Sequence, residues 1–172
     1  MRHFLLTLVI FAVVGAPATA KAGPPTCDSI TPADLEQITG LKLTAPSVDR
    51  LDVCGGLCEG SDGTSCLFSG SDDNPGAQVM VEIRLPPFLN MYNAAAYNAM
   101  RRATSGNDQL KPGISVQVLG RPAIWDFSAA SSELHIFADP DLHLAIYQSG
   151  EDTEGSAFKK AEAIAALVLA NK

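Results

Sequence analysis

The residues of this chain with the clearest capacity for chemistry are its four cysteines, Cys27, Cys54, Cys58 and Cys66. Four thiolates could bind zinc or an iron–sulfur cluster, but zinc sites favour closer pairs such as C-x2-C over the Cys54-x3-Cys58 spacing. A redox pair needs a neighbouring positive charge that lowers a thiol pKa, and no basic residue stands beside Cys54 or Cys58 in the sequence. Disulfide bonding is therefore the favoured interpretation, with three pairings open.

Two histidines form the second group of candidates. His135 and His143 fall on the outward face of an expected hairpin together with Glu133, and neighbours across two strands are close enough to share a metal ion. Because a third or fourth ligand is not evident, we predict no bound metal. Haem attachment is excluded because Glu59, not His, follows Cys58, so we predict no cofactor.

We also predict no catalytic residues. Serine, histidine and aspartate are all present, but the Gly-x-Ser-x-Gly elbow of many hydrolases is absent, and composition alone does not indicate a triad. The sequence therefore favours a protein that is not an enzyme.

The first 20 residues have the three parts of a secretory signal peptide. A short basic start is followed by the apolar residues 4–16 and then by Ala18-Thr-Ala20, after which we expect cleavage. The apolar run is shorter than the roughly 20 residues that span a bilayer, so we expect no membrane span once the signal is removed. Residues 21–172 are then expected to form a single domain in the periplasm or outside the cell, where disulfides persist.

Local patterns predict the elements that must position these side chains. Thr31 can cap a helix over 32–39, Pro32 suits its first position, and Gly40 can end it. Elsewhere, alternating apolar residues predict strands, and apolar residues at helical spacing predict helices. The expected strands are 65–69, 78–85, 114–119, 123–127, 133–138 and 142–148, and the expected long helices are 89–103 and 156–170.

The order of these elements predicts an α+β fold, in which two long helices and a short N-terminal helix pack on an antiparallel sheet. In the hairpin of 133–138 and 142–148, one face carries apolar core residues. The opposite face carries Phe137, Ala145 and Tyr147 with the two histidines. We expect a helix to cover this face, and the alternative is a small exposed apolar patch.

Several short motifs resemble a family of small exported bacterial proteins of unknown function, many of them lipoproteins. The motifs are Cys27-Asp-Ser-Ile-Thr-Pro-Ala-Asp-Leu-Glu-Gln-Ile-Thr-Gly40, Ser65-Cys66-Leu-Phe68, Val118-Leu-Gly-Arg-Pro-Ala123 and an alanine-rich final helix. The resemblance covers nearly all of residues 21–172. It implies a PsbP-like α/β fold with a curved antiparallel sheet covered by helices. It also implies that Cys27 pairs with Cys66, and it supplies no catalytic residues.

The chain departs from that family in two ways. It has no cysteine placed for lipid attachment, and it adds Cys54 and Cys58. We predict that these two form a second disulfide, because Gly55-Gly56 give the backbone the freedom to bring the sulfurs together.

Together, these features favour a non-enzymatic binding or interaction domain of the bacterial cell envelope. The alternative is a carrier for a small apolar molecule, and a hydrolase or redox enzyme comes third. A surface apolar groove would favour interaction, an enclosed cavity a carrier, and converging titratable side chains an enzyme. The net charge of −7 makes nucleic acid and anionic membranes poor partners, so the expected partner is an envelope or extracellular protein or a small ligand.

Overall fold

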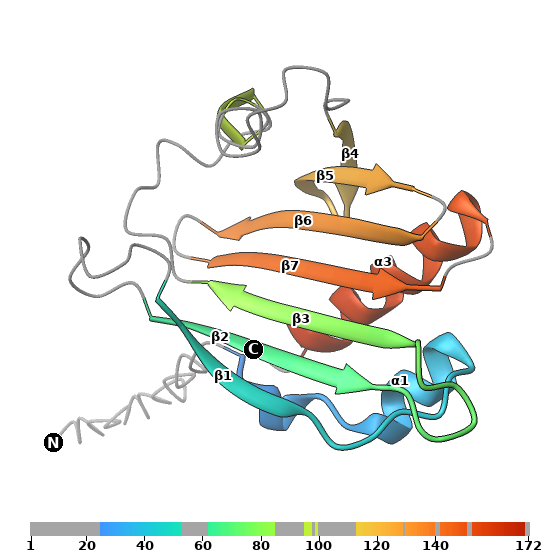
Figure 1. Ribbon diagram of the computed structural model, residues 1–172. Coiled ribbons are helices and arrows are strands. Elements are labelled where there is room, and N and C mark those ends of the chain that lie inside the picture. The colour runs from blue at the N-terminus through green and yellow to red at the C-terminus, as the bar shows by residue number, and fades with distance from the viewer. Residues whose placement is uncertain are drawn as a thin grey trace, which may run out of the picture.

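The computed structural model of the protein describes residues 25–52, 62–84, 95–97, 99, 113–128, 130–139, 142–150 and 153–170. Within these residues the chain forms a seven-stranded antiparallel sheet with helices against one face (Figure 1). The expected signal peptide, residues 1–20, and the expected Cys54–Cys58 disulfide lie outside the described residues.

The sheet is built from two blocks of strands that are consecutive in the chain. They are β1 (Ser47–Asp52), β2 (Asp62–Ser69) and β3 (Gln78–Arg84), followed by β4 (Ile114–Val118), β5 (Arg121–Phe127), β6 (Ser131–Asp139) and β7 (Leu142–Ser149). The spatial order is β1-β2-β3-β7-β6-β5-β4, so the two blocks meet where β3 pairs with β7.

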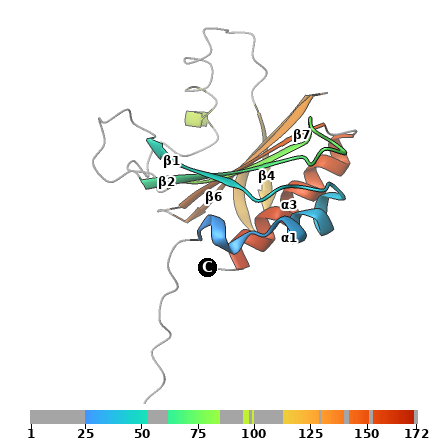
Figure 2. The same ribbon diagram turned by 60° about the horizontal axis from the view of Figure 1, so that its bottom comes forward.

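Helices cover one face of this sheet. A single turn of 3-10 helix, η1 (Cys27–Ser29), precedes α1 (Pro32–Thr39), and α3 (Glu154–Ala170) follows β7. Figure 2 shows α1 and α3 on the same side of the sheet, and α3 packs against β6 and β7. No helix in the described part of the chain is both long and apolar enough to cross a membrane.

Helix α1 confirms the helix expected over 32–39. Thr31 and Asp34 form a capping box, in which the Thr31 side chain accepts from the Asp34 backbone N–H and the Asp34 carboxylate accepts from that of Thr31. Gly40 ends the helix in the left-handed region with φ of 75°.

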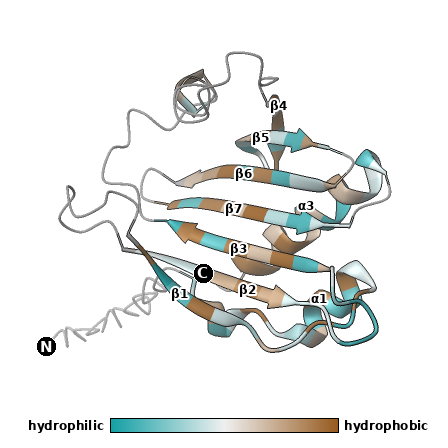
Figure 3. Ribbon diagram, in the orientation of Figure 1, coloured by the Kyte–Doolittle hydropathy of each residue, from teal (hydrophilic) through white to brown (hydrophobic). Residues whose placement is uncertain are grey.

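The expected strands are present, and local signals explain most of them. Hydrophobic and hydrophilic residues are interspersed along β3 in Figure 3, and Val79, Val81 and Ile83 of this strand enter the core. β2 pairs with β3 across a turn at which Gly70 is required, because a Cβ there would lie 1.8 Å from the Asn74 carbonyl oxygen. The sequence patterns did not predict β1, whose residues are mostly polar and exposed.

The expectation of two long helices on the sheet was wrong. Helix α3 is the one long helix that the structure describes, and the sheet dominates the fold. Within the other expected long helix, 89–103, the described residues are 95–97 and 99. Helical spacing predicts a buried stripe of Tyr92, Ala95, Ala96, Ala99 and Ala103, and the described residues of this stripe are not its buried side. Ala95 and Ala99 are exposed, whereas Tyr97, outside that stripe, is buried. Alanines bury little apolar area, so they were a weak basis for placing a helix on the sheet.

A disulfide between Cys27 and Cys66 joins η1 to β2. Both cysteines are buried in the hydrophobic core. This is the first of the two pairings that we predicted. It fixes the start of the helical layer to the sheet.

Candidate functional site

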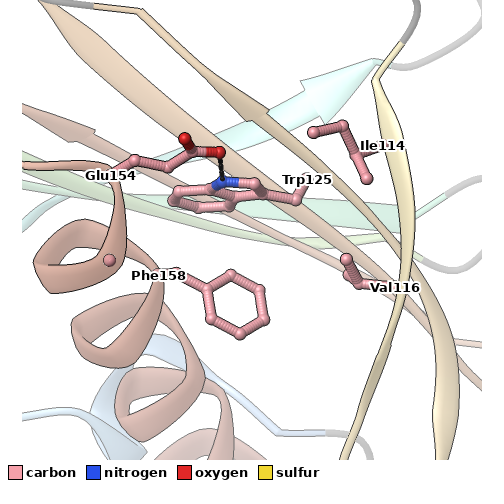
Figure 4. A pocket seen from close by; sticks show the side chains of 6 residues that line it. Ile114, Val116, Trp125, Glu154 and Phe158 are labelled. Carbon is pink, nitrogen blue, oxygen red and sulfur yellow. Dashed lines mark hydrogen bonds between the residues drawn. The ribbon is translucent and has the colours of Figure 1, made fainter.

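An apolar pocket lies where the β4–β5 end of the sheet meets the first turns of α3. It has a volume of about 360 Å³ and is lined by Ile114, Val116, Trp125, Glu154, Gly155 and Phe158. Figure 4 shows the Trp125 and Phe158 rings and the Ile114 and Val116 side chains around one shared space. Ile114 is 58% exposed, so the pocket is accessible from solvent on its side.

Trp125 is held firmly in the wall of this pocket. Its indole Nε1 donates a hydrogen bond to Glu154 Oε1 at 3.3 Å. The Phe158 ring meets it edge-on with centroids 5.2 Å apart, and the Phe127 ring stacks at 6.4 Å. Because the indole is anchored by both polar and aromatic contacts, it presents a fixed apolar surface.

Three elements bring the pocket residues together. The tight turn at Leu119 and Gly120, with φ of 52° and 73°, folds β4 back on β5 and pairs Ile114 with Trp125. Glu154 and Phe158 are four residues apart in α3 and therefore share one helix face. The alternation of Trp125 and Phe127 with Asp126 predicts that both rings face the core, and Trp125 is buried there. This alternation did not reveal that one edge of the indole would line a pocket with α3.

The opposite face of the sheet holds a second candidate, the buried cluster of His135, His143 and Tyr97. His135 Nδ1 lies 3.2 Å from His143 Nε2, and His135 Nε2 lies 2.5 Å from the Tyr97 hydroxyl. A neutral imidazole has one donor and one acceptor nitrogen. In the tautomer with the proton on Nδ1, His135 accepts from Tyr97 and donates to His143, and in the tautomer with the proton on Nε2 both directions are reversed.

Aromatic stacking fixes the two imidazoles. The His135 and His143 rings stack with centroids 5.3 Å apart, and the Phe137 ring stacks on His143 at 5.1 Å. Both histidines are only 1% exposed. We expected these side chains on the face of the hairpin away from the core and expected that face to be covered. Their burial fits a covered face and not the alternative of an exposed apolar patch.

Charged residues of β3 and β6 surround this cluster. Glu133 Oε2 is 3.5 Å from His135 Nε2. Glu82 and Arg84 form an ion pair, and the Tyr147 hydroxyl donates to Glu82 at 3.4 Å. The cluster therefore contains acidic, basic and phenolic groups within a mostly buried volume.

Burial governs the protonation of these groups. Desolvation lowers the pKa of His135, against the opposing effect of the Glu133 carboxylate. Desolvation, together with His135 and Arg84, lowers the pKa of His143 well below its usual value. Burial and the Glu82 charge raise the pKa of Tyr147. Both histidines are neutral at pH 7, so the contact between Glu133 and His135 is not an ion pair there.

The cluster does not have the form of a metal centre. Among the described residues, no three histidine, cysteine, aspartate or glutamate side chains converge as ligands. Both ring nitrogens of His135 already contact Tyr97 and His143. The absence of a bound metal and the absence of catalytic residues both stay predictions.

No protein-family model matches the chain, and a search of curated proteins found no match to it. The resemblance to a family of exported bacterial proteins therefore stays a prediction.

Proposed function

We propose that the protein is a non-catalytic binding domain of the bacterial cell envelope, and that the Trp125 pocket is its binding site. The observation that carries this proposal is an apolar pocket with an anchored indole wall and an exposed Ile114 at its side. Binding sites characteristically combine apolar and aromatic walls with a few placed polar groups, and Glu154 supplies such a group here.

The shape of the pocket favours a protein-binding role over that of a small-molecule carrier. A carrier encloses most of its ligand, whereas this pocket is lined by a residue that is more than half exposed. The His135 cluster is the best support for an enzyme. However, its histidines are buried against each other and against Tyr97 instead of facing an accessible space.

An oxidising compartment is supported by the Cys27–Cys66 disulfide, since disulfides persist mainly in exported proteins. An envelope or extracellular protein is therefore the proposed partner.

A comparison of three proteins tests this function. The exported protein, its Ile114→Asp variant and its Val48→Asp variant would each be used to capture partners from bacterial envelope extract. Ile114 and Val48 are 58% and 56% exposed, so the two substitutions place the same charge on equally accessible strand residues. We expect a partner to be retained by the wild type and by Val48→Asp and lost with Ile114→Asp. Identical capture by all three proteins, or no specific capture, would contradict the proposal.

A further inference from the structure

The pocket adjoins the outer edge of strand β4. β4 is the last strand in the order of the sheet, and no described strand pairs with its outer side. Ile114–Val118 contains no charged residue and no proline, and its register with β5 is continuous. Proteins usually protect an edge of this kind with charges, proline or a bulge, because unpaired backbone groups there readily accept another strand.

The other edge of the same sheet is protected. β1 places Asp49 and Arg50 in exposed positions on the outermost strand. Charged side chains on an edge oppose the addition of a further strand. The contrast between the two edges indicates that the edge of β4 can accept an additional strand, whereas the edge of β1 opposes one.

The pocket lies where an added strand would place its side chains. Ile114 and Val116 alternate along β4 and both line the pocket, so they share one face of the sheet. A neighbouring strand has side chains on that face about 5 Å away. An apolar side chain of an added strand would therefore reach the space beside Trp125 and Phe158.

The charged residue of the pocket determines which side chains an added strand should carry. Glu154 is the one charged residue among the six that line the pocket, and its carboxylate is held by the Trp125 N–H. The whole chain is also acidic, with a net charge of −7. A lysine or arginine beside the apolar side chain would complement this carboxylate, whereas an acidic residue would be repelled.

We propose that β4 binds an extended segment of a partner protein by strand addition, with an apolar residue in the Trp125 pocket and a neighbouring Lys or Arg at Glu154. The backbone hydrogen bonds of the added strand supply affinity, and the pocket and the carboxylate supply selectivity. This inference rests on the proposed binding function and names the class of partner that the pocket takes.

Synthetic peptides provide the test with the exported protein. The first probe is acetyl-Lys-Thr-Ile-Thr-Val-Lys-amide, in which Lys, Ile and Val share one face. The second has the same side chains with its Thr, Ile, Thr and Val amides N-methylated, which removes the four central backbone donors. The third replaces both lysines by glutamates. Binding is followed by the emission of Trp125, the only tryptophan, and by hydrogen exchange of the amides of 114–118.

We expect the first peptide to shift the Trp125 emission and to slow amide exchange in β4. N-methylation, replacement of lysine by glutamate, and Ile114→Asp should each weaken binding about tenfold or more. Glu154→Gln keeps an acceptor for the indole and should reduce the preference for the lysine peptide over the glutamate peptide. Val48→Asp should bind the first peptide as the wild type does.

Two results would overturn the inference. One is equal affinity for the first and the N-methylated peptide, and the other is binding by the wild type and Ile114→Asp alike. Toluene, a small apolar ligand, tests the pocket without strand addition and so distinguishes failure of strand addition from failure of the pocket. If toluene shifts the methyl resonances of Ile114 and Val116 but no peptide binds, strand addition is wrong and the pocket stands. If neither toluene nor any peptide binds, the proposed function fails as well.

Discussion

His135 and His143 stack inside the protein with ring centroids 5.3 Å apart, and neither ring can gain a proton without carrying a charge into a desolvated site. His135 also contacts the Tyr97 hydroxyl. The three side chains therefore link the outer side of the β6–β7 hairpin to a residue far away in the sequence, and the link requires neutral imidazoles.

We expect the stability of the protein to fall as the pH drops below about 6.5, the ordinary pKa of histidine. The folded-state pKa values of His135 and His143 are lowered, so the unfolded chain binds more protons between these values and 6.5. The free energy of unfolding then rises with pH across that interval. The contribution of the neutral histidines is fully present above pH 6.5 and is lost as the pH falls below it. Each histidine contributes a slope of up to about 1.4 kcal/mol per pH unit. Urea unfolding at about pH 7.5, 6.5 and 5.5 measures this.

His143→Gln is the matched control for the pH experiment. Glutamine does not titrate, and its amide can still accept from His135. The free energy of unfolding of the variant should depend less on pH than that of the wild type, whatever its value at pH 7.5. A wild-type protein equally stable at all three pH values, or a variant with the same slope as the wild type, would contradict the prediction.

Alternation along the strands placed both histidines on the correct face of the hairpin. It did not identify the residues that contact the histidines there, such as Tyr97, because a period of two residues assigns a side chain to a face and says nothing about what packs on it. The same limit applies to the Trp125 pocket. Trp125 and Phe158 come together only through the packing of α3 on the sheet, which no local pattern reports.

At the scale of elements, α1 depends on its capping box. The Thr31 hydroxyl donates to Asp34 Oδ2 at 2.6 Å and accepts from the Asp34 backbone N–H at 3.2 Å. These bonds satisfy groups at the start of the helix that have no partner within it. Helix α1 in turn packs against α3, so its stability contributes to that of the helical layer.

We expect Thr31→Ala to lower the free energy of unfolding by about 1 kcal/mol, because the cap is lost. Thr31→Ser keeps the hydroxyl and should change it much less. Chemical denaturation of both variants gives the comparison. If the two variants unfold at the same denaturant concentration, the cap does not support α1 in the way described.

The elements that the sequence predicted well are those with a local cause. Helix α1 has a cap, a proline and a terminal glycine, and β3 has apolar core residues at every second position, 79, 81 and 83. The elements predicted poorly lack such a cause. β1 is mainly polar and becomes a strand because it pairs with β2, and the expected helix over 89–103 rested on alanines.

At the scale of the whole molecule, the Cys27–Cys66 disulfide closes a loop with a sequence separation of 39 residues. The chain-entropy model gives about 4 kcal/mol of stabilisation for a loop of this length. We therefore expect Cys27→Ala/Cys66→Ala to unfold at a markedly lower urea concentration than the wild type.

Reductant supplies the control for the disulfide. It should lower the stability of the wild type toward that of the double variant and change the double variant little. An oxidised wild type that is no more stable than the reduced protein would show that the disulfide does not stabilise the fold.

The junction of the two strand blocks has a consequence for how the protein folds. Every other described pairing joins strands that follow one another in the chain, whereas β3 and β7 bring Val79 beside Gln148. Hairpins form early because they close short loops. The pairing of β3 with β7 must close a long loop, and the entropy cost of that closure comes before the new contacts stabilise the chain. The folding rate should therefore be set by a single late closure. Residues 27 and 66 both precede β4, so the disulfide can form in the growing chain before the second block exists to complete the sheet.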